Sequence, residues 1–168
     1  MQMQRTLVLN HLQIEQKINR IAHEIYEYNF EESEIVIAGI ADRGYILAQR
    51  IHKVLTNISP LKSRLIELKL NKNNLRQEPY DLKMGSEELK NKVVLLVDDV
   101  LNTGLTLMYA LQPFLAYDVK KIATIVLVDR NHNLFPVRAD YVGLSMATTL
   151  QEHVSVEFSE GNDAAYLC

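Results

Sequence analysis

Cysteine is almost absent from this sequence. The chain of 168 residues has one cysteine, Cys168, which is its last residue. A single thiol excludes an internal disulfide, and a catalytic thiol is not expected on a chain end that is prone to fraying. Redox and thiol chemistry can therefore be set aside.

Long apolar runs are also missing. No stretch approaches the roughly 18 apolar residues of a membrane span, and residues 1–17 contain no apolar run long enough for a signal peptide. We therefore expect a cytoplasmic protein that has no membrane partner.

Positive charge is in slight deficit, with 18 Lys and Arg against 21 Asp and Glu and a net charge of -3. Strong non-specific binding to nucleic acid needs a basic surface, so the composition argues against it and leaves only a local RNA site open. Low-complexity and Pro-rich or Ser-rich linkers are absent, and the length suits one hydrophobic core. We expect a single domain, residues 1–168.

Apolar patterns of helical and of strand type alternate along the chain. Helical spacing predicts helices at residues 12–28, 47–55 and 107–114. Apolar runs predict strands at residues 35–39, 61–70, 93–97 and 122–128, and shorter ones at 140–143, 154–158 and 164–167. This rhythm predicts an α/β fold with a central, mostly parallel sheet flanked by helices. Residues 70–90 are polar and lack periodicity, which predicts a flexible hood loop.

Residues 93–106, VVLLVDDVLNTGLT, are the segment in which we expect the ligand-binding site. A buried strand delivers Asp98 and Asp99 to its carboxyl end, where ligands of α/β sheets lie, and a turn with Thr103, Gly104 and Thr106 opens the next helix. The N–H groups of a helix N-terminus suit a phosphate, and Gly104 allows close backbone approach. Two carboxylates would repel that phosphate unless they faced sugar hydroxyls or a hydrated Mg²⁺. A ribose 5-phosphate satisfies both requirements.

Two simpler interpretations of this segment exist. One is an ordinary strand-to-helix turn capped by Asp and Thr. The other is a receiver domain, in which paired acids bind Mg²⁺, but those acids lie at different strand ends and no T-G-x-T turn follows them.

Residues 93–106 resemble the phosphoribosyl pyrophosphate signature of type I phosphoribosyltransferases. The resemblance implies the type I phosphoribosyltransferase fold, ribose hydroxyls held by Asp98 and Asp99, and Mg²⁺ bound with the substrate near these aspartates. The residues implied to wrap the 5-phosphate are Asn102, Thr103, Gly104, Leu105 and Thr106.

Residues 18–29, 39–51 and 127–143 resemble the PyrR family, bacterial pyrimidine-operon regulators that are also uracil phosphoribosyltransferases. The similarity spans nearly the whole chain. It implies transfer of ribose 5-phosphate to uracil, giving UMP, in a homodimer or higher homo-oligomer. The alternatives are a uridine-nucleotide sensor that binds pyrimidine leader RNA with little turnover, and salvage of another base such as hypoxanthine.

The family's pyrophosphate loop falls on Ala41, Asp42, Arg43 and Gly44. Arg43 is the candidate catalytic residue there because its fork pairs with two phosphate oxygens, although a solvated loop arginine is the simpler interpretation. An acid at Asp42, where the family has a neutral residue, should weaken phosphate binding unless a cation offsets it.

Lys72, in the hood, is the remaining pyrophosphate candidate. The family has Tyr-Arg-Asp-Asp where this chain has residues 71–74, Asn-Lys-Asn-Asn, so only a positive charge is retained. A solvated loop explains Lys72 and Arg76 equally well.

Asn102 and Asp129 replace the aspartate and the lysine that purine enzymes place beside the base, which favours a pyrimidine. Asp129, Arg130, Tyr141 and Val142 are the candidates for the base pocket. A loop cap is the simpler interpretation of Asp129.

Arg20, His23, His132 and Arg138 fall on the family's RNA-binding surface. Arg20 and His23 share one helix face, which an ordinary exposed helix would also explain. The other histidines lack metal-ligand spacing and receive no role; they are His11, His52 and His153.

Overall fold

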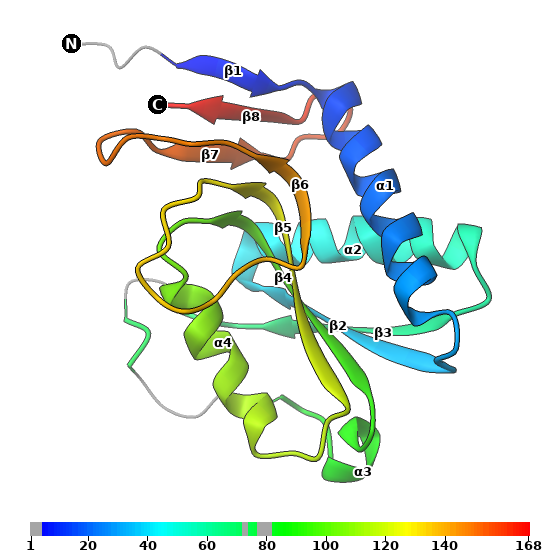
Figure 1. Ribbon diagram of the computed structural model, residues 1–168. Helices are drawn as coiled ribbons and strands as arrows, with labels where there is room; N and C mark the ends of the chain where they lie inside the picture. Colours follow the sequence, from blue (N-terminus) through cyan, green and yellow to red (C-terminus); the bar gives the residue numbers. More distant parts are fainter. Residues whose placement is uncertain (1–4, 72–73, 77–81) are drawn as a thin grey trace.

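A five-stranded parallel sheet forms the centre of the molecule (Figure 1). The computed structural model describes residues 5–71, 74–76 and 82–168. The strand order is β3-β2-β4-β5-β6, and every pairing in this sheet is parallel, which confirms the predicted α/β class. The strands are β2 (Glu34–Ile40), β3 (Lys62–Leu68), β4 (Val93–Leu101), β5 (Lys121–Asp129) and β6 (Tyr141–Ser145).

Helices cover both faces of this sheet. Helices α1 (His11–Asn29) and α2 (Ala41–Ile58) pack on one face, and α3 (Ser86–Leu89) and α4 (Leu105–Leu115) on the other. Alternate residues of a strand point to opposite faces, so Ile35 joins the core under α1 while Val36 joins the core under α4. Burial on both faces explains why the strands read as continuous apolar runs. No helix in the described part of the chain is both long and apolar enough to cross a membrane.

A small antiparallel sheet lies beyond the carboxyl ends of β4 and β5 (Figure 1). Its order is β1-β8-β7, from β1 (Thr6–Leu9), β7 (Val154–Glu157) and β8 (Ala164–Leu167). Strand β1 was not predicted, and its partner β8 lies at the other end of the chain. The predicted strands near residues 154 and 164 are confirmed.

Three elements differ from the sequence prediction. Helix α2 begins at Ala41 and not near residue 47, so the predicted turn 41–44 forms the helix's first turn. Strand β4 continues to Leu101, because Asp98 and Val100 still pair with β5. Within the predicted hood, α3 starts where Glu88 accepts the N–H of Gly85 at 2.7 Å. Residues 72–73 and 77–81 of the hood lie outside the described residues.

A buried carboxylate fastens the small sheet to the main body. Asp163, in the turn between β7 and β8, is 2% exposed and accepts hydrogen bonds from both terminal nitrogens of Arg50 on α2. His11, which opens α1, lies with Nδ1 2.9 Å from the same carboxylate. Burial alone would raise the pKa of Asp163, but the Arg50 guanidinium and the Ser159 N–H outweigh it and lower that pKa below its ordinary value.

Replacing this carboxylate should loosen the small sheet. Asp163→Asn leaves the Arg50 charge without its partner, so we expect the free energy of unfolding at pH 7 to fall by about 3–5 kcal/mol. Because the folded-state pKa is lowered, the carboxylate stabilises the fold above its unfolded pKa, and this contribution is lost as pH falls through the folded pKa.

Urea unfolding from pH 7 to pH 2 measures this effect. The gap between the wild type and Asp163→Asn should close at the acid end, while the exposed Asp118→Asn serves as the matched control. Equal stability of Asp163→Asn and the wild type at pH 7 would contradict the proposed anchoring.

Candidate functional site

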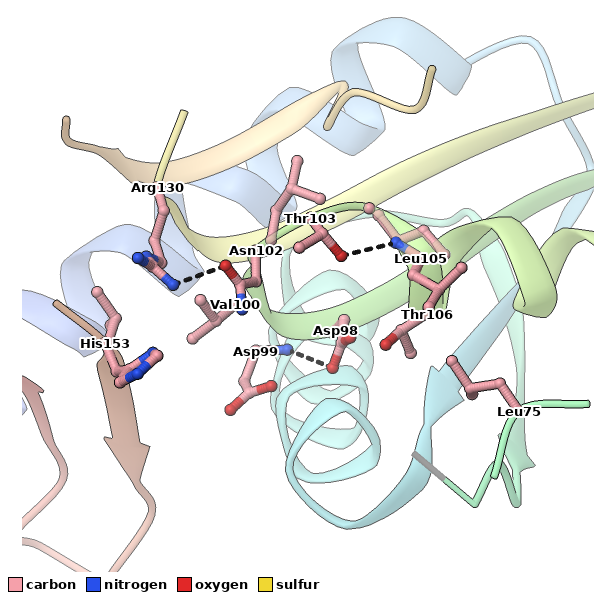
Figure 2. Close-up of a pocket in the computed structure, with 14 residues that line it drawn as sticks. Leu75, Asp98, Asp99, Val100, Asn102, Thr103, Leu105, Thr106, Arg130 and His153 are labelled. Atoms are coloured by element: carbon pink, nitrogen blue, oxygen red, sulfur yellow. Dashed lines mark hydrogen bonds between the residues drawn. The ribbon is translucent and has the colours of Figure 1, made fainter. Parts of the chain in front are cut away.

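A pocket of about 360 Å³ opens at the carboxyl end of β4 (Figure 2). Its wall consists of residues 98–107, Arg130, His153 directly before β7, Val154 at the start of β7, and Leu75. The two predicted aspartates and the five predicted phosphate-binding residues of the turn therefore line one pocket.

Asp98 and Asp99 are almost fully buried, with 2% and 5% of their surface exposed. The Asp99 N–H donates to Asp98 Oδ1 at 3.0 Å, which orients the first carboxylate. Buried carboxylates are costly unless they face hydrogen-bond donors or cations. One cation is near, because Arg43 Nη1 lies 3.9 Å from Asp99 Oδ2.

The turn after β4 is shaped by Gly104. Its φ of 90° lies in the left-handed region, which residues with a side chain rarely adopt, and it caps the N-terminus of α4. Thr103 Oγ1 accepts the N–H of Leu105 at 3.3 Å. The first turn of α4 and the hydroxyls of Thr103 and Thr106 therefore border the pocket together, an arrangement suited to a phosphate.

The start of α2 is pressed against β4 behind the aspartates. A Cβ on Gly44 would lie 2.6 Å from the Val97 carbonyl oxygen and 3.1 Å from Asp98 Cα, so only glycine permits this approach. Asp42 is exposed in the first turn of α2, where a carboxylate interacts favourably with the helix dipole. Ala41, the first residue of α2, has a φ of 38°, a positive value that residues with a side chain rarely adopt.

The predicted pyrophosphate residues are thus only partly brought to the site. Ala41, Asp42, Arg43 and Gly44 do not line the pocket itself, but Gly44 touches Asp98 and Arg43 reaches Asp99. Lys72 lies outside the described residues.

Arg130 lines the pocket with a guanidinium that is extensively hydrogen-bonded. The residue is 3% exposed, and it donates from Nη1 to Asn102 Oδ1 at 2.6 Å and from Nε to Thr148 Oγ1 at 2.9 Å. Nη2 donates to the carbonyls of Thr149 and Glu152. Arg130 therefore joins the phosphate turn to the segment that precedes β7.

The other predicted base residues lie elsewhere. Asp129 Oδ1 accepts the N–H of Asn131 at 2.8 Å, as the loop-cap interpretation requires. Tyr141 pairs with Ile125 in the middle of β5, not at that strand's carboxyl end, and packs edge-on against Tyr28. Burial raises the pKa of Tyr141. Val142 belongs to the core under α4, so neither Tyr141 nor Val142 reaches this pocket.

The predicted RNA-binding residues also lie outside the pocket. Arg20 donates to Glu24 and to the carbonyls of Val142 and Gly143, so it ties α1 to β6. His23 Nδ1 lies 2.8 Å from the Asn19 carbonyl oxygen on the same helix. His132 and Arg138 lie in the loop between β5 and β6.

His153 is a polar residue of the pocket that the sequence analysis did not assign to the site. Its backbone pairs with that of Cys168 in both directions, at 2.9 and 2.8 Å, which fixes the start of β7. His153 reaches the pocket because the small sheet lies beside β4, and no local sequence motif predicts that placement.

The acidic pair suits a magnesium ion that arrives with a phosphorylated ligand. Mg²⁺ keeps several waters and binds through one or two carboxylates together with substrate phosphates. Among residues 5–71, 74–76 and 82–168, no group of three or more His, Cys, Asp or Glu side chains forms a metal site by itself. The donor set thus fits a shared site in which the ligand supplies the other oxygens.

The comparisons with known proteins agree with this geometry. The model of the phosphoribosyl transferase domain matches residues 4–159. The bifunctional protein PyrR of Clostridium kluyveri is 36% identical over 162 residues, covering 93% of this chain and 92% of that protein. The PyrR of Staphylococcus saprophyticus is 35% identical over 165 residues, covering 94% of each.

Solved structures show the same fold. The hypoxanthine phosphoribosyltransferase of Trypanosoma cruzi superposes with a TM-score of 0.71 at 18% identity, covering 89% of this chain and 84% of that one. This likeness confirms the predicted type I phosphoribosyltransferase fold. The chain belongs to the phosphoribosyl transferase domain family and, within it, to the PyrR proteins.

Proposed function

We propose that this protein transfers ribose 5-phosphate from phosphoribosyl pyrophosphate to uracil, giving UMP and pyrophosphate. The observation that carries the proposal is one pocket in which a buried acidic pair adjoins a glycine turn at a helix N-terminus. The N-terminus of α4 suits a phosphate, and the two carboxylates suit the hydroxyls of the attached sugar.

The chemistry proposed for this pocket is mainly positioning. The bond from the sugar C1 to a pyrophosphate oxygen breaks while a bond from C1 to N1 of uracil forms, and the departing pyrophosphate takes up the proton that N1 gives up. No nucleophilic side chain is needed. Asp98 and Asp99 hold the sugar and favour the positive charge that develops on its ring, as in other glycosyl transfers.

Arg43 is placed to act on the departing pyrophosphate. Its side chain is about half exposed, and its contact with Asp99 is long at 3.9 Å, so it is able to turn toward a phosphate group. Bound Mg²⁺ would supply further neutralisation of the pyrophosphate charge. The departure from the family at Asp42 is explained by its favourable place in the first turn of α2.

Removing both carboxyl charges tests the sugar contacts. We expect Asp98→Asn with Asp99→Asn to slow pyrophosphate release by at least about 100-fold, because preorganised charge at the reacting centre is lost. Asp118→Asn, an exposed change, should leave the rate unaltered. Full activity in the double variant would refute the assigned role of the aspartates.

The close packing of α2 on β4 gives a second test. In Gly44→Ala the new methyl group meets the Val97 carbonyl, so we expect a loss of about 1–3 kcal/mol in stability together with weaker binding of phosphoribosyl pyrophosphate. Calorimetric titration and thermal unfolding measure both. Gly85→Ala, whose nearest neighbour would be 3.7 Å away, is the matched control. Unchanged affinity in Gly44→Ala would show that the start of α2 is unrelated to the site.

A second function, uridine-nucleotide-dependent binding of pyrimidine leader RNA, is favoured by one contact. The N–H groups of Leu134 and Phe135 both donate to the Thr103 carbonyl, at 2.9 and 3.1 Å. The loop that holds His132 and Arg138 is thereby joined to the phosphate turn. A nucleotide in the pocket could thus alter the presentation of these two residues, whereas Arg20 is committed to β6.

RNA binding with and without UMP tests this second function. We expect UMP to tighten binding of the leader RNA, and Arg138→Ala to weaken it and to reduce the salt dependence by about one phosphate contact. Arg64→Ala, on the edge strand β3 at the opposite side of the sheet, is the control. RNA affinity that is independent of both UMP and Arg138 would contradict the proposed role.

A further inference from the structure

One wall of the pocket has polar side chains to which the proposed sugar and phosphate contacts assign no role, including the side chain of Asn102, whose backbone belongs to the phosphate turn. The acidic pair and the turn around Gly104 accommodate the sugar and its 5-phosphate, and Arg43 approaches the acidic pair from α2. The remaining polar side chains of the pocket are Asn102, Arg130 and His153 (Figure 2).

The orientation of Asn102 is dictated by Arg130. A guanidinium has only donors, so at 2.6 Å the amide of Asn102 must present its oxygen to it. Charge assistance strengthens this bond and disfavours the flipped amide. Figure 2 shows the amide nitrogen of Asn102 pointing away from Arg130. That nitrogen donates to none of the described residues, so its N–H groups are available to a ligand.

His153 supplies a second donor to this wall. An imidazole carries one N–H when neutral and two when protonated, so it is always able to donate. The Glu152 carbonyl, directly before it, accepts from Arg130, and the Cys168 backbone pairs with its own. Figure 2 shows the imidazole, on the residue directly before β7, projecting into the pocket.

We propose that Asn102 and His153 form the donor edge that recognises the C4 carbonyl oxygen of the base, the position at which cytosine carries an amino group, with Arg130 as the positioning residue that holds both. This inference rests on the proposed function. A base with an amino group on that edge would set donor against donor and leave polar groups unpaired. The site therefore selects an oxo-pyrimidine such as uracil over its amino counterpart cytosine.

Two substitutions test the donor edge without disturbing the buried guanidinium. Asn102→Asp keeps an oxygen for Arg130 but replaces the donor by an acceptor, and His153→Ala removes the second donor. We expect each to lower kcat/KM for uracil roughly tenfold or more, since a hydrogen bond to the base is lost. The dissociation constant of His153→Ala for phosphoribosyl pyrophosphate, measured by calorimetry without base, should stay within about twofold.

Rescue and control variants separate recognition from folding. His153→Gln retains an N–H donor and should recover most of the activity, whereas His52→Gln, a histidine bonded to Ser63 outside the pocket, should behave as the wild type. The uracil-to-cytosine preference should fall in Asn102→Asp, while its melting temperature stays close to that of the wild type. Arg130→Lys should lower the uracil-to-cytosine preference, because a lysine ammonium lacks the fixed fork that holds the Asn102 amide in one orientation.

The outcomes discriminate between the two proposals. If the wild-type protein failed to bind phosphoribosyl pyrophosphate, the proposed function and this inference would both be overturned. If it bound and turned over uracil, but His153→Ala and Asn102→Asp kept wild-type kcat/KM and selectivity, only the donor edge would be overturned.

Discussion

The parallel pairing of β4 with β2 and β5 is the constraint on which the candidate site depends. Parallel strands end at the same edge of a sheet, so the segments that follow all three strands meet there. The end of β2 delivers Arg43, the end of β4 delivers the aspartates and the phosphate turn, and the end of β5 delivers Arg130. The absence of a side chain at Gly44 lets the first of these segments lie against the second.

The small antiparallel sheet completes the pocket because it is held at two separate places. Asp163 joins it to α1 and α2 on the far side, and Arg130 joins the segment before β7 to the phosphate turn. Both links are charged hydrogen-bonding groups with little exposure, where a lost partner is costly. The position of His153 therefore depends on two hydrogen-bond networks, one centred on Asp163 and one on Arg130, whose central residues are far apart in the sequence.

Local signals explain what the sequence could predict. Helix α1 and strands β2 and β5 have strong periodic or β-branched patterns, and the β4–α4 turn is specified within a few consecutive residues. Its glycine, threonines and aspartates line the same pocket, so this one segment was enough to predict a sugar phosphate site. The order of helices and strands then fixed the parallel sheet.

Contacts between distant segments explain what it could not predict. The short β1 exists only because β8 pairs with it, and α2 begins early because Gly44 fits against β4. Tyr141 is one of the residues predicted for the base pocket, but the register of β6 directs it toward α1. His153 reaches the pocket through the folding of the small sheet, which no spacing in the sequence records.

The most direct test of the central claim is a crystal structure of the protein grown with phosphoribosyl pyrophosphate and Mg²⁺. The account predicts the 5-phosphate against the backbone of residues 103–106 and the ribose hydroxyls within hydrogen-bonding distance of Asp98 and Asp99. Density for the sugar phosphate at any other place, with this pocket empty, would contradict it.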